Sequence, residues 1–115
     1  MKVLIVDDEA FIGNLFRDIC EMADTPCDVA LTREEARNLM EKETYDMVFV
    51  DYSLKGGDGI AFMNDMKSNG WEGSAFLISG WPPSHFPPED LLSFKKVLHK
   101  PFNIKDVLDI LQNHG

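Results

Sequence analysis

The strongest constraint on the fold is the run Met47–Val50, four apolar residues followed directly by Asp51 and a glycine-rich turn. A short apolar run containing Val and Phe is typical of a strand buried on both faces of a parallel sheet. In open α/β sheets, functional groups lie just past the carboxyl ends of the strands. Asp51 is therefore a candidate functional residue, although an Asp at this place also begins many ordinary turns.

Four further segments have the character of short strands, and polar groups stand at the ends of three of them. The apolar run Val3–Val6 ends in Asp7 and Asp8. We expect the other strands at residues 27–31, 75–80 and 97–99, where Ser79 closes the second of these and Lys100 follows the last. Four strands thus carry polar or charged groups at their carboxyl ends.

Helices are predicted between these strands. Apolar residues recur at helical spacing over residues 10–23, and Thr32 with Glu35 forms a capping-box signature for the next helix. A third helix is expected to begin near Asp58 or Gly59 and to close at Gly70. In the final helix, capped by Asn103, the residues expected to face inward are Ile104, Val107, Leu108 and Leu111.

The segment Trp81–Pro88 interrupts the alternation because four of its eight residues are proline. Proline removes a backbone donor and disfavours the helical conformation of the residue before it. We expect only a short helix, from Glu89 to about Lys95, so the fourth helix of the fold should be atypical or shortened.

Strands that alternate with helices predict an α/β fold with a parallel sheet. We expect a flavodoxin-like, doubly wound sheet of five strands in the order 2-1-3-4-5, with helices on both faces, as one domain over residues 1–115. In this order the first and third strands are neighbours, so Asp7, Asp8 and Asp51 should meet at one edge of the sheet.

Composition narrows the class of partner. The chain has a net charge of -9, which disfavours nucleic acid and anionic membranes as direct partners. No apolar stretch approaches the ~20 residues that span a bilayer, and the N-terminus does not resemble a signal peptide. We therefore expect a cytoplasmic protein. Cys20 and Cys27 lack the spacing of a zinc site and are expected to be free thiols.

The groups gathered at the predicted edge point to phosphoryl chemistry. Three crowded carboxylates require protons or a cation, and Mg²⁺ prefers such oxygen ligands. The Ser79 hydroxyl and the Lys100 ammonium are suited to phosphoryl oxygens. An Asp with these neighbours has what is needed to form an aspartyl phosphate. Each residue taken alone also has an ordinary structural interpretation, and the combination carries the prediction.

At this point the chain resembles the receiver domain of two-component response regulators, a family within the CheY-like superfamily. The resemblance rests on residues 3–9, on Val48–Asp51 with Gly56 and Gly59, on Leu77–Gly80 and on Lys100-Pro101-Phe102, and it covers essentially the whole chain. The spacing between these motifs also agrees with the family.

The resemblance implies that Asp51 accepts a phosphoryl group from a histidine kinase or a histidine phosphotransfer protein. It further implies that Asp7, Asp8, Asp51 and the backbone carbonyl of Ser53 hold Mg²⁺, and that Ser79 and Lys100 contact the phosphoryl oxygens. Such domains catalyse their own phosphorylation and dephosphorylation but act mainly as switches, through protein partners and sometimes by dimerising. The Lys100-Pro101 peptide bond should be cis.

Some positions depart from the family pattern. Val97 stands where a switching Tyr or Phe is usual, and Lys55 stands where Pro is common. Trp81, two residues after Ser79, should lie near the mouth of the site, where its ring would limit the entry of water. With His85 and Phe86, Trp81 is also a candidate for a protein contact, although these side chains could equally fold back over the fourth helix.

Two other functions stay open. The same fold also occurs as a phosphorylation-independent interaction module, although the complete set of five site residues argues against that. A magnesium-dependent phosphatase of another α/β family would want an acid two residues after the nucleophile, where this chain has Ser53.

Overall fold

A computed structural model describes residues 1–114 of the chain. Its central element is a parallel five-stranded sheet in the order β2-β1-β3-β6-β7. The strands are β1 (Val3–Val6), β2 (Cys27–Ala30), β3 (Met47–Asp51), β6 (Ser74–Ser79) and β7 (Lys96–His99). Since β4 and β5 form a separate small sheet, this order is the predicted 2-1-3-4-5.

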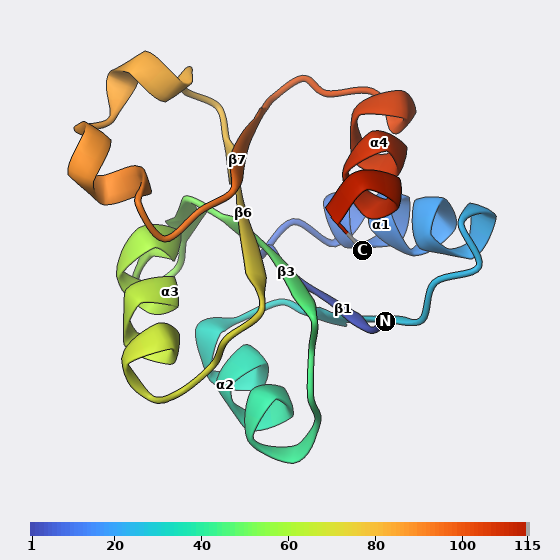
Figure 1. The fold of residues 1–115 in the computed structure, drawn as a ribbon, viewed down its shortest axis with the longest axis horizontal. Helices are drawn as coiled ribbons and strands as arrows, with labels where there is room; N and C mark the ends of the chain where they lie inside the picture. The colour runs from blue at the N-terminus through green and yellow to red at the C-terminus, as the bar shows by residue number, and fades with distance from the viewer. Residues whose placement is uncertain (115) are drawn as a thin grey trace.

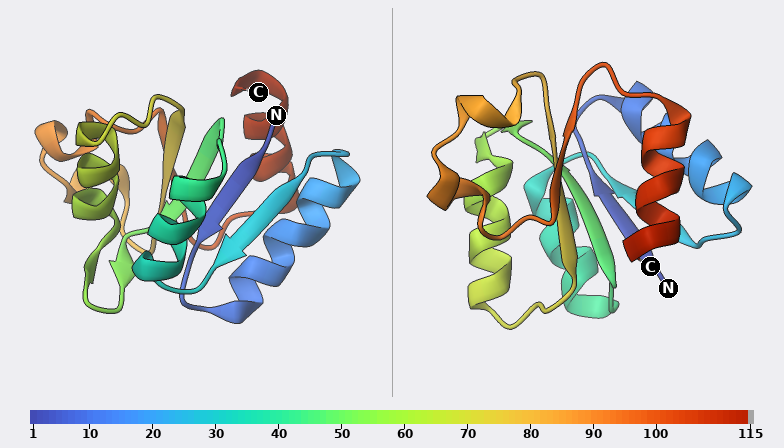
Figure 2. Two further views of the ribbon diagram at one scale, coloured as in Figure 1. Left: turned by 90° about the horizontal axis from the view of Figure 1, so that it is seen from below. Right: turned by 45° about the horizontal axis from the view of Figure 1, so that its top comes forward.

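Within residues 1–114, four α-helices cover the sheet, two on each face (Figure 1). The helices α1 (Ala10–Met22) and α4 (Ile104–His114) pack on one face, and α2 (Arg33–Lys42) and α3 (Gly59–Ser68) pack on the other. The two further views in Figure 2 show the same layers from below and with the top tilted forward. The predicted doubly wound architecture is confirmed.

Side-chain caps begin three of the helices. Thr32 Oγ1 accepts the Glu35 N–H at 3.0 Å, whereas the Glu35 carboxylate accepts the N–H of Leu31 rather than that of Thr32. Asp58 Oδ1 accepts the Ala61 N–H at 2.7 Å at the start of α3. Asn103 and Asp106 cap each other's backbone N–H groups at the start of α4. These polar groups fix the starts of three helices: α2 after β2, α3 after the loop that follows β3, and α4 after β7.

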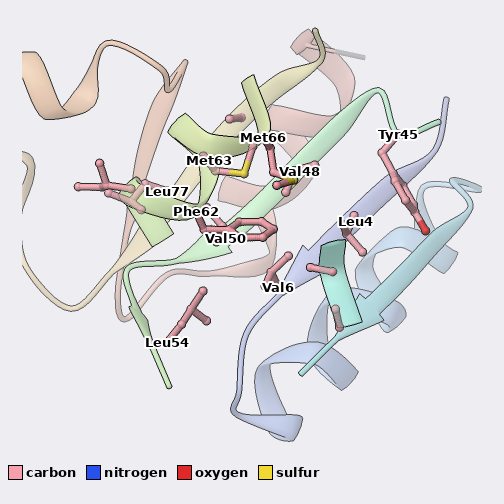
Figure 3. Packing of buried hydrophobic residues seen from close by; sticks show 14 of the residues in the cluster. Leu4, Val6, Tyr45, Val48, Val50, Leu54, Phe62, Met63, Met66 and Leu77 are labelled. Atoms are coloured by element: carbon pink, nitrogen blue, oxygen red, sulfur yellow. The ribbon is translucent and has the colours of Figure 1, made fainter. Parts of the chain in front are cut away.

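The core consists of two layers, one on each face of the sheet. Figure 3 shows the layer beneath α2 and α3, where strand residues such as Val48 and Val50 meet Phe62, Met63 and Met66 of α3. On the other face Phe16 of α1 packs against Phe49 with ring centroids 4.9 Å apart. Because β3 is buried on both faces, Asp51 at its end is held by a rigid central strand.

The buried face of α4 differs from the prediction at one position. Ile104 is 44% exposed, whereas Val107, Ile110 and Leu111 are buried. Ile104 is the first residue of the helix, and the apolar stripe begins one turn later, at the spacing i, i+3, i+4. The prediction that Ile104 faces inward was wrong, and Ile110 belongs to the core.

The proline-rich segment forms two short 3₁₀ helices, η1 (Pro83–His85) and η2 (Pro88–Leu91). No α-helix occurs between β6 and β7, a region that lies wholly within the described residues, so the expectation of an atypical fourth helix is confirmed. The helical turn stops at Leu91, short of the predicted Lys95, because the Lys95 N–H already donates to the Ala75 carbonyl of β6 at 2.8 Å.

A small antiparallel hairpin, β4 (Ser53–Leu54) and β5 (Gly57–Asp58), follows β3 and was not predicted. Gly56 adopts a φ of 82°, which favours glycine at this turn. The Arg33 guanidinium at the start of α2 donates to the Gly56 carbonyl. This contact joins the loop after Asp51 to the helix α2.

Candidate functional site

The carboxyl ends of four parallel strands bring the predicted residues to one edge of the sheet. Asp51 is the last residue of β3 and Ser79 is the last residue of β6. Asp7 and Lys100 directly follow β1 and β7. The register of the strands places these carboxyl ends side by side. Val6 pairs with Val50, Asp51 with Ile78, and Ser79 with His99.

Three carboxylates form the centre of the site. One oxygen each from Asp7, Asp8 and Asp51 lies within 4.8 Å of the other two. Asp7 is fully buried, Asp51 is 4% exposed and Asp8 is partly exposed. Burying like charges this close is unfavourable without a compensating cation.

Lys100 supplies one compensating charge. Its Nζ lies 3.4 Å from Asp51 Oδ1 and 3.8 Å from Asp7 Oδ2. It also lies 3.4 Å from Glu9 Oε1, a contact that the sequence reasoning did not assign. The signal for Glu9 was present, because it is the third acid of the run after β1. One lysine near the C-terminus therefore faces two carboxylates from the N-terminal part of the chain and one from its middle.

Burial and charge shift the pKa values in the site. Burial raises the pKa of Asp7 to about 6, helped by the Asp51 charge and opposed by the Glu9 backbone N–H, which donates to Asp7 Oδ1 at 2.9 Å. Burial also raises the pKa of Asp51, against the charge of Lys100. For Lys100, burial alone would lower the pKa, but the nearby carboxylates outweigh it and the pKa is raised.

The second oxygen of Asp7 lacks a hydrogen-bond donor. Within residues 1–114, Oδ2 is the one buried side-chain oxygen or nitrogen without a hydrogen-bond partner. Buried polar atoms are nearly always satisfied, so an orphan acceptor among three carboxylates is the mark of a cation site. The donor set, which consists of oxygen atoms alone, fits Mg²⁺.

Ser79 is fully buried and its hydroxyl oxygen accepts the backbone N–H of Trp81 at 2.8 Å. This leaves the hydroxyl proton to donate elsewhere. The Trp81 ring stacks on His85 at 4.4 Å and stays 52% exposed. Phe86, in contrast, is buried with its ring edge against Tyr52 at 4.9 Å, so it does not belong to an exposed aromatic surface.

Gly59 allows α3 to begin directly beside Asp51. A Cβ at Gly59 would lie 2.2 Å from the Asp51 carbonyl oxygen, which no side chain tolerates. The Gly59 N–H also donates to the Tyr52 carbonyl at 2.9 Å. Ser53 is the exposed residue of β4 in the adjoining hairpin, and the ligand role of its carbonyl stays a prediction.

Comparison with known proteins identifies the family to which this chain belongs. The sequence model of the response regulator receiver domain matches residues 3–112. The chain belongs to this family. It is a receiver domain of the kind found in two-component response regulators.

Solved receiver domains share its fold. A CheY-like receiver domain from Methylobacillus flagellatus is 26% identical, with a TM-score of 0.90 over 100% of this chain and 98% of that one. The receiver domain of Francisella response regulator 1452 is 23% identical, with a TM-score of 0.89 over 97% and 93% of the two chains. No match was found among curated proteins.

A third solved structure is similar in fold alone. It is the response regulator TrrA from Thermotoga maritima, in complex with Mg²⁺ and BeF, and it is 19% identical to this receiver domain. Its TM-score is 0.87, over 99% of this chain and 98% of that one.

One further expectation, on the backbone after β7, is met in this receiver domain. The Lys100-Pro101 peptide bond is cis. Among the helices of residues 1–114, none has the length and apolar character needed to cross a membrane.

Proposed function

We propose that this receiver domain is a phosphoacceptor switch, in which Asp51 takes a phosphoryl group from a phosphohistidine of a partner kinase or phosphotransfer protein. The observation that carries the proposal is the cluster of Asp7, Asp8 and Asp51 with the Lys100 ammonium beside it. Two of the three carboxylates are buried, and Asp7 Oδ2 has no hydrogen-bond partner, which favours a bound cation over a merely structural role.

In the proposed reaction, a carboxylate oxygen of Asp51 forms a bond to phosphorus while the bond from phosphorus to the histidine nitrogen breaks. The departing imidazole keeps the electron pair. Asp7, Asp8, Asp51 and the Ser53 carbonyl would hold Mg²⁺, which supplies positive charge to the phosphoryl oxygens. Lys100 adds its own charge from 3.4 Å, and the Ser79 hydroxyl donates a hydrogen bond.

Exposed side chains at the start of α1 offer a contact for the phosphodonor near Asp51. Phe11, in the first turn of α1, is 73% exposed, and Asn14 beside it is exposed as well. Leu15, on the same helix, is partly buried and packs against the core. An exposed aromatic side chain beside the acidic site favours docking of a protein.

The output of the switch is proposed to be a protein contact in the cytoplasm, with dimerisation on phosphorylation as one form of it. Direct binding of nucleic acid is not expected from a chain of net charge -9. Val97 cannot act as a rotating aromatic switch. The segment between β6 and β7, with its two 3₁₀ helices, is therefore the part we expect to respond.

Beryllofluoride, which mimics a phosphoryl group, tests this function. With Mg²⁺ present it should shift the backbone amide NMR signals of Asp51, Ser79, Trp81 and Lys100, and Asp51→Asn should abolish the shifts. A wild-type spectrum that stays unchanged would favour the phosphorylation-independent interaction module.

A further inference from the structure

The two cysteines lie where helix α1 rests on the edge strand β2. A Cβ at Gly13 would be 2.6 Å from Val29 Cγ1, so the helix touches the strand directly there. Cys20 follows Gly13 by seven residues, two helical turns along the same face. Cys27 precedes Val29 by two residues and so points to the same side of β2. The packing that brings Gly13 onto Val29 thus also brings Cys20 to Cys27.

The two thiols are neighbours at this place. Both side chains pack in the one apolar cluster between α1 and the sheet, Cys20 in its buried part and Cys27 at its margin. The connection between the two residues is tight, since the Thr25 N–H donates to the Cys20 carbonyl at 2.8 Å and Asp24 adopts a φ of 52°. Both cysteines are free thiols, Cys20 fully buried and Cys27 partly exposed.

Their surroundings give the two sulfurs different roles. The neighbouring Cys20 thiol lowers the pKa of Cys27 to about 7; the charge of Arg17 acts in the same direction, while burial and Asp28 oppose it. The Cys27 side chain, together with burial, raises the pKa of Cys20. Thiolates react with peroxides and thiols do not. Cys27 is therefore the reactive sulfur at neutral pH, and the buried Cys20 beside it stays a protonated thiol.

We propose that Cys27 and Cys20 form a peroxide-sensitive thiol pair that closes to an intramolecular disulfide. The Cys27 thiolate attacks one oxygen of a hydroperoxide, the O–O bond breaks, and the alkoxide or hydroxide leaves. The product is Cys27 sulfenic acid. Cys20 sulfur then attacks the Cys27 sulfur, the S–O bond breaks, and the Cys20 proton leaves with the hydroxide as water.

The disulfide would join the C-terminal part of α1 to β2, which is an edge of the sheet. Reversible disulfides of this kind are the form in which such bonds occur in reducing compartments. Cys20 and Cys27 belong neither to the cluster of Asp7, Asp8 and Asp51 nor to the segment between β6 and β7. The modification site is therefore separate from the proposed phosphorylation site.

Intact mass and thiol counting after treatment with hydrogen peroxide test this proposal. The folded wild-type chain should lose both titratable thiols and the mass of two hydrogen atoms while remaining monomeric, and dithiothreitol should restore both. A folded chain that keeps two thiols under conditions where the urea-unfolded chain loses them would overturn the proposal. So would a disulfide that forms only between two chains.

Two variants separate the roles of the sulfurs. Cys20→Ala should stop at the sulfenic acid, seen as the gain of one oxygen and trapped by dimedone at Cys27. Cys27→Ser should leave Cys20 unreacted. Oxidation of Cys20 in Cys27→Ser at the wild-type rate would contradict the assigned order. If Cys20→Ala does not fold, the wild-type mass decides the matter alone.

Discussion

The Nζ of Lys100 lies 3.4 Å from Oδ1 of Asp51, although 49 positions separate the two residues in the sequence. The contact arises because β7 and β3 end at the same edge of the sheet, on either side of β6. The lysine is thus already in place beside the oxygen that we propose to be phosphorylated.

Replacing Lys100 should have opposite effects on metal binding and on phosphorylation. In Lys100→Ala the carboxylates lose their fixed positive charge, so we expect Mg²⁺ to bind several-fold more tightly. Phosphorylation by a small phosphodonor should slow by roughly tenfold or more, because one charge that neutralises the phosphoryl oxygens is lost. Calorimetry with Mg²⁺ and phosphorylation kinetics measure the two effects.

Lys105→Ala is the matched control, since this lysine is 83% exposed and pairs with Asp109 on the surface of α4. It should leave both measurements unchanged. Equal effects of the two substitutions would mean that Lys100 acts only through the net charge of the protein.

Asp7 should make the stability of the metal-free protein depend on pH. Burial raises its pKa from 3.8 to about 6, so the folded chain holds this proton more tightly than the unfolded chain does. The free energy of unfolding therefore falls as the pH rises from about 4 to about 6, and stays lower above that.

Asp7→Asn removes the free-energy cost of burying the ionised Asp7 carboxylate. In EDTA at pH 7 the variant should be more stable than wild type by about 3 kcal/mol, and the difference should vanish below about pH 4. Urea unfolding at several pH values measures it. A variant that is less stable than wild type at pH 7 would show that the ion pair with Lys100 outweighs the cost of burial.

Gly59 and Gly80 offer a paired test of how the site is built. Gly59→Ala would place a Cβ 2.2 Å from the Asp51 carbonyl oxygen, whereas a Cβ at Gly80 meets nothing within 4 Å. We expect Gly59→Ala to destabilise the fold by about 2–3 kcal/mol and Gly80→Ala to be nearly neutral. Thermal unfolding of both variants checks this, and equal melting temperatures would contradict the close packing of α3 on β3.

The sequence was most informative where one strong local pattern determines the structure. Continuous apolar runs such as Val3–Val6 predicted the buried strands, and alternation with helices predicted the strand order. The hairpin β4–β5 was missed because each of its strands has two residues, too few for any periodic signal. Part of what holds it, the Arg33 contact with Gly56, spans 23 positions in the sequence.

The candidate site was predictable because each of its residues stands at the end of a strand. Asp7, Asp51, Ser79 and Lys100 could be placed together by topology alone. The contact of Glu9 with Lys100, by contrast, depends on a side-chain direction that sequence does not give. For Phe86 the sequence left open a protein contact and a position folded back on the chain, because a proline-rich loop carries no periodicity from which its burial could be predicted.

Trp81 should control how long a phosphoryl group survives on Asp51. The backbone N–H of Trp81 donates to Ser79 Oγ, beside the carboxyl end of β6. The half-exposed Trp81 ring stacks on His85. We expect Trp81→Ala to lose the phosphoryl group several-fold faster, because water reaches the site more easily. His85→Ala, which removes only the stacking partner, should have a smaller effect. An unchanged decay rate in Trp81→Ala would remove this role.

The most direct test of the proposed phosphoacceptor function is the intact mass of the protein after incubation with Mg²⁺ and acetyl phosphate, measured for wild type and Asp51→Asn. The wild-type chain should gain the mass of one phosphoryl group, only when Mg²⁺ is present, and the variant should gain none. Equal phosphorylation of the two proteins, or phosphorylation that persists in EDTA, would contradict the assignment of Asp51 and its carboxylate neighbours.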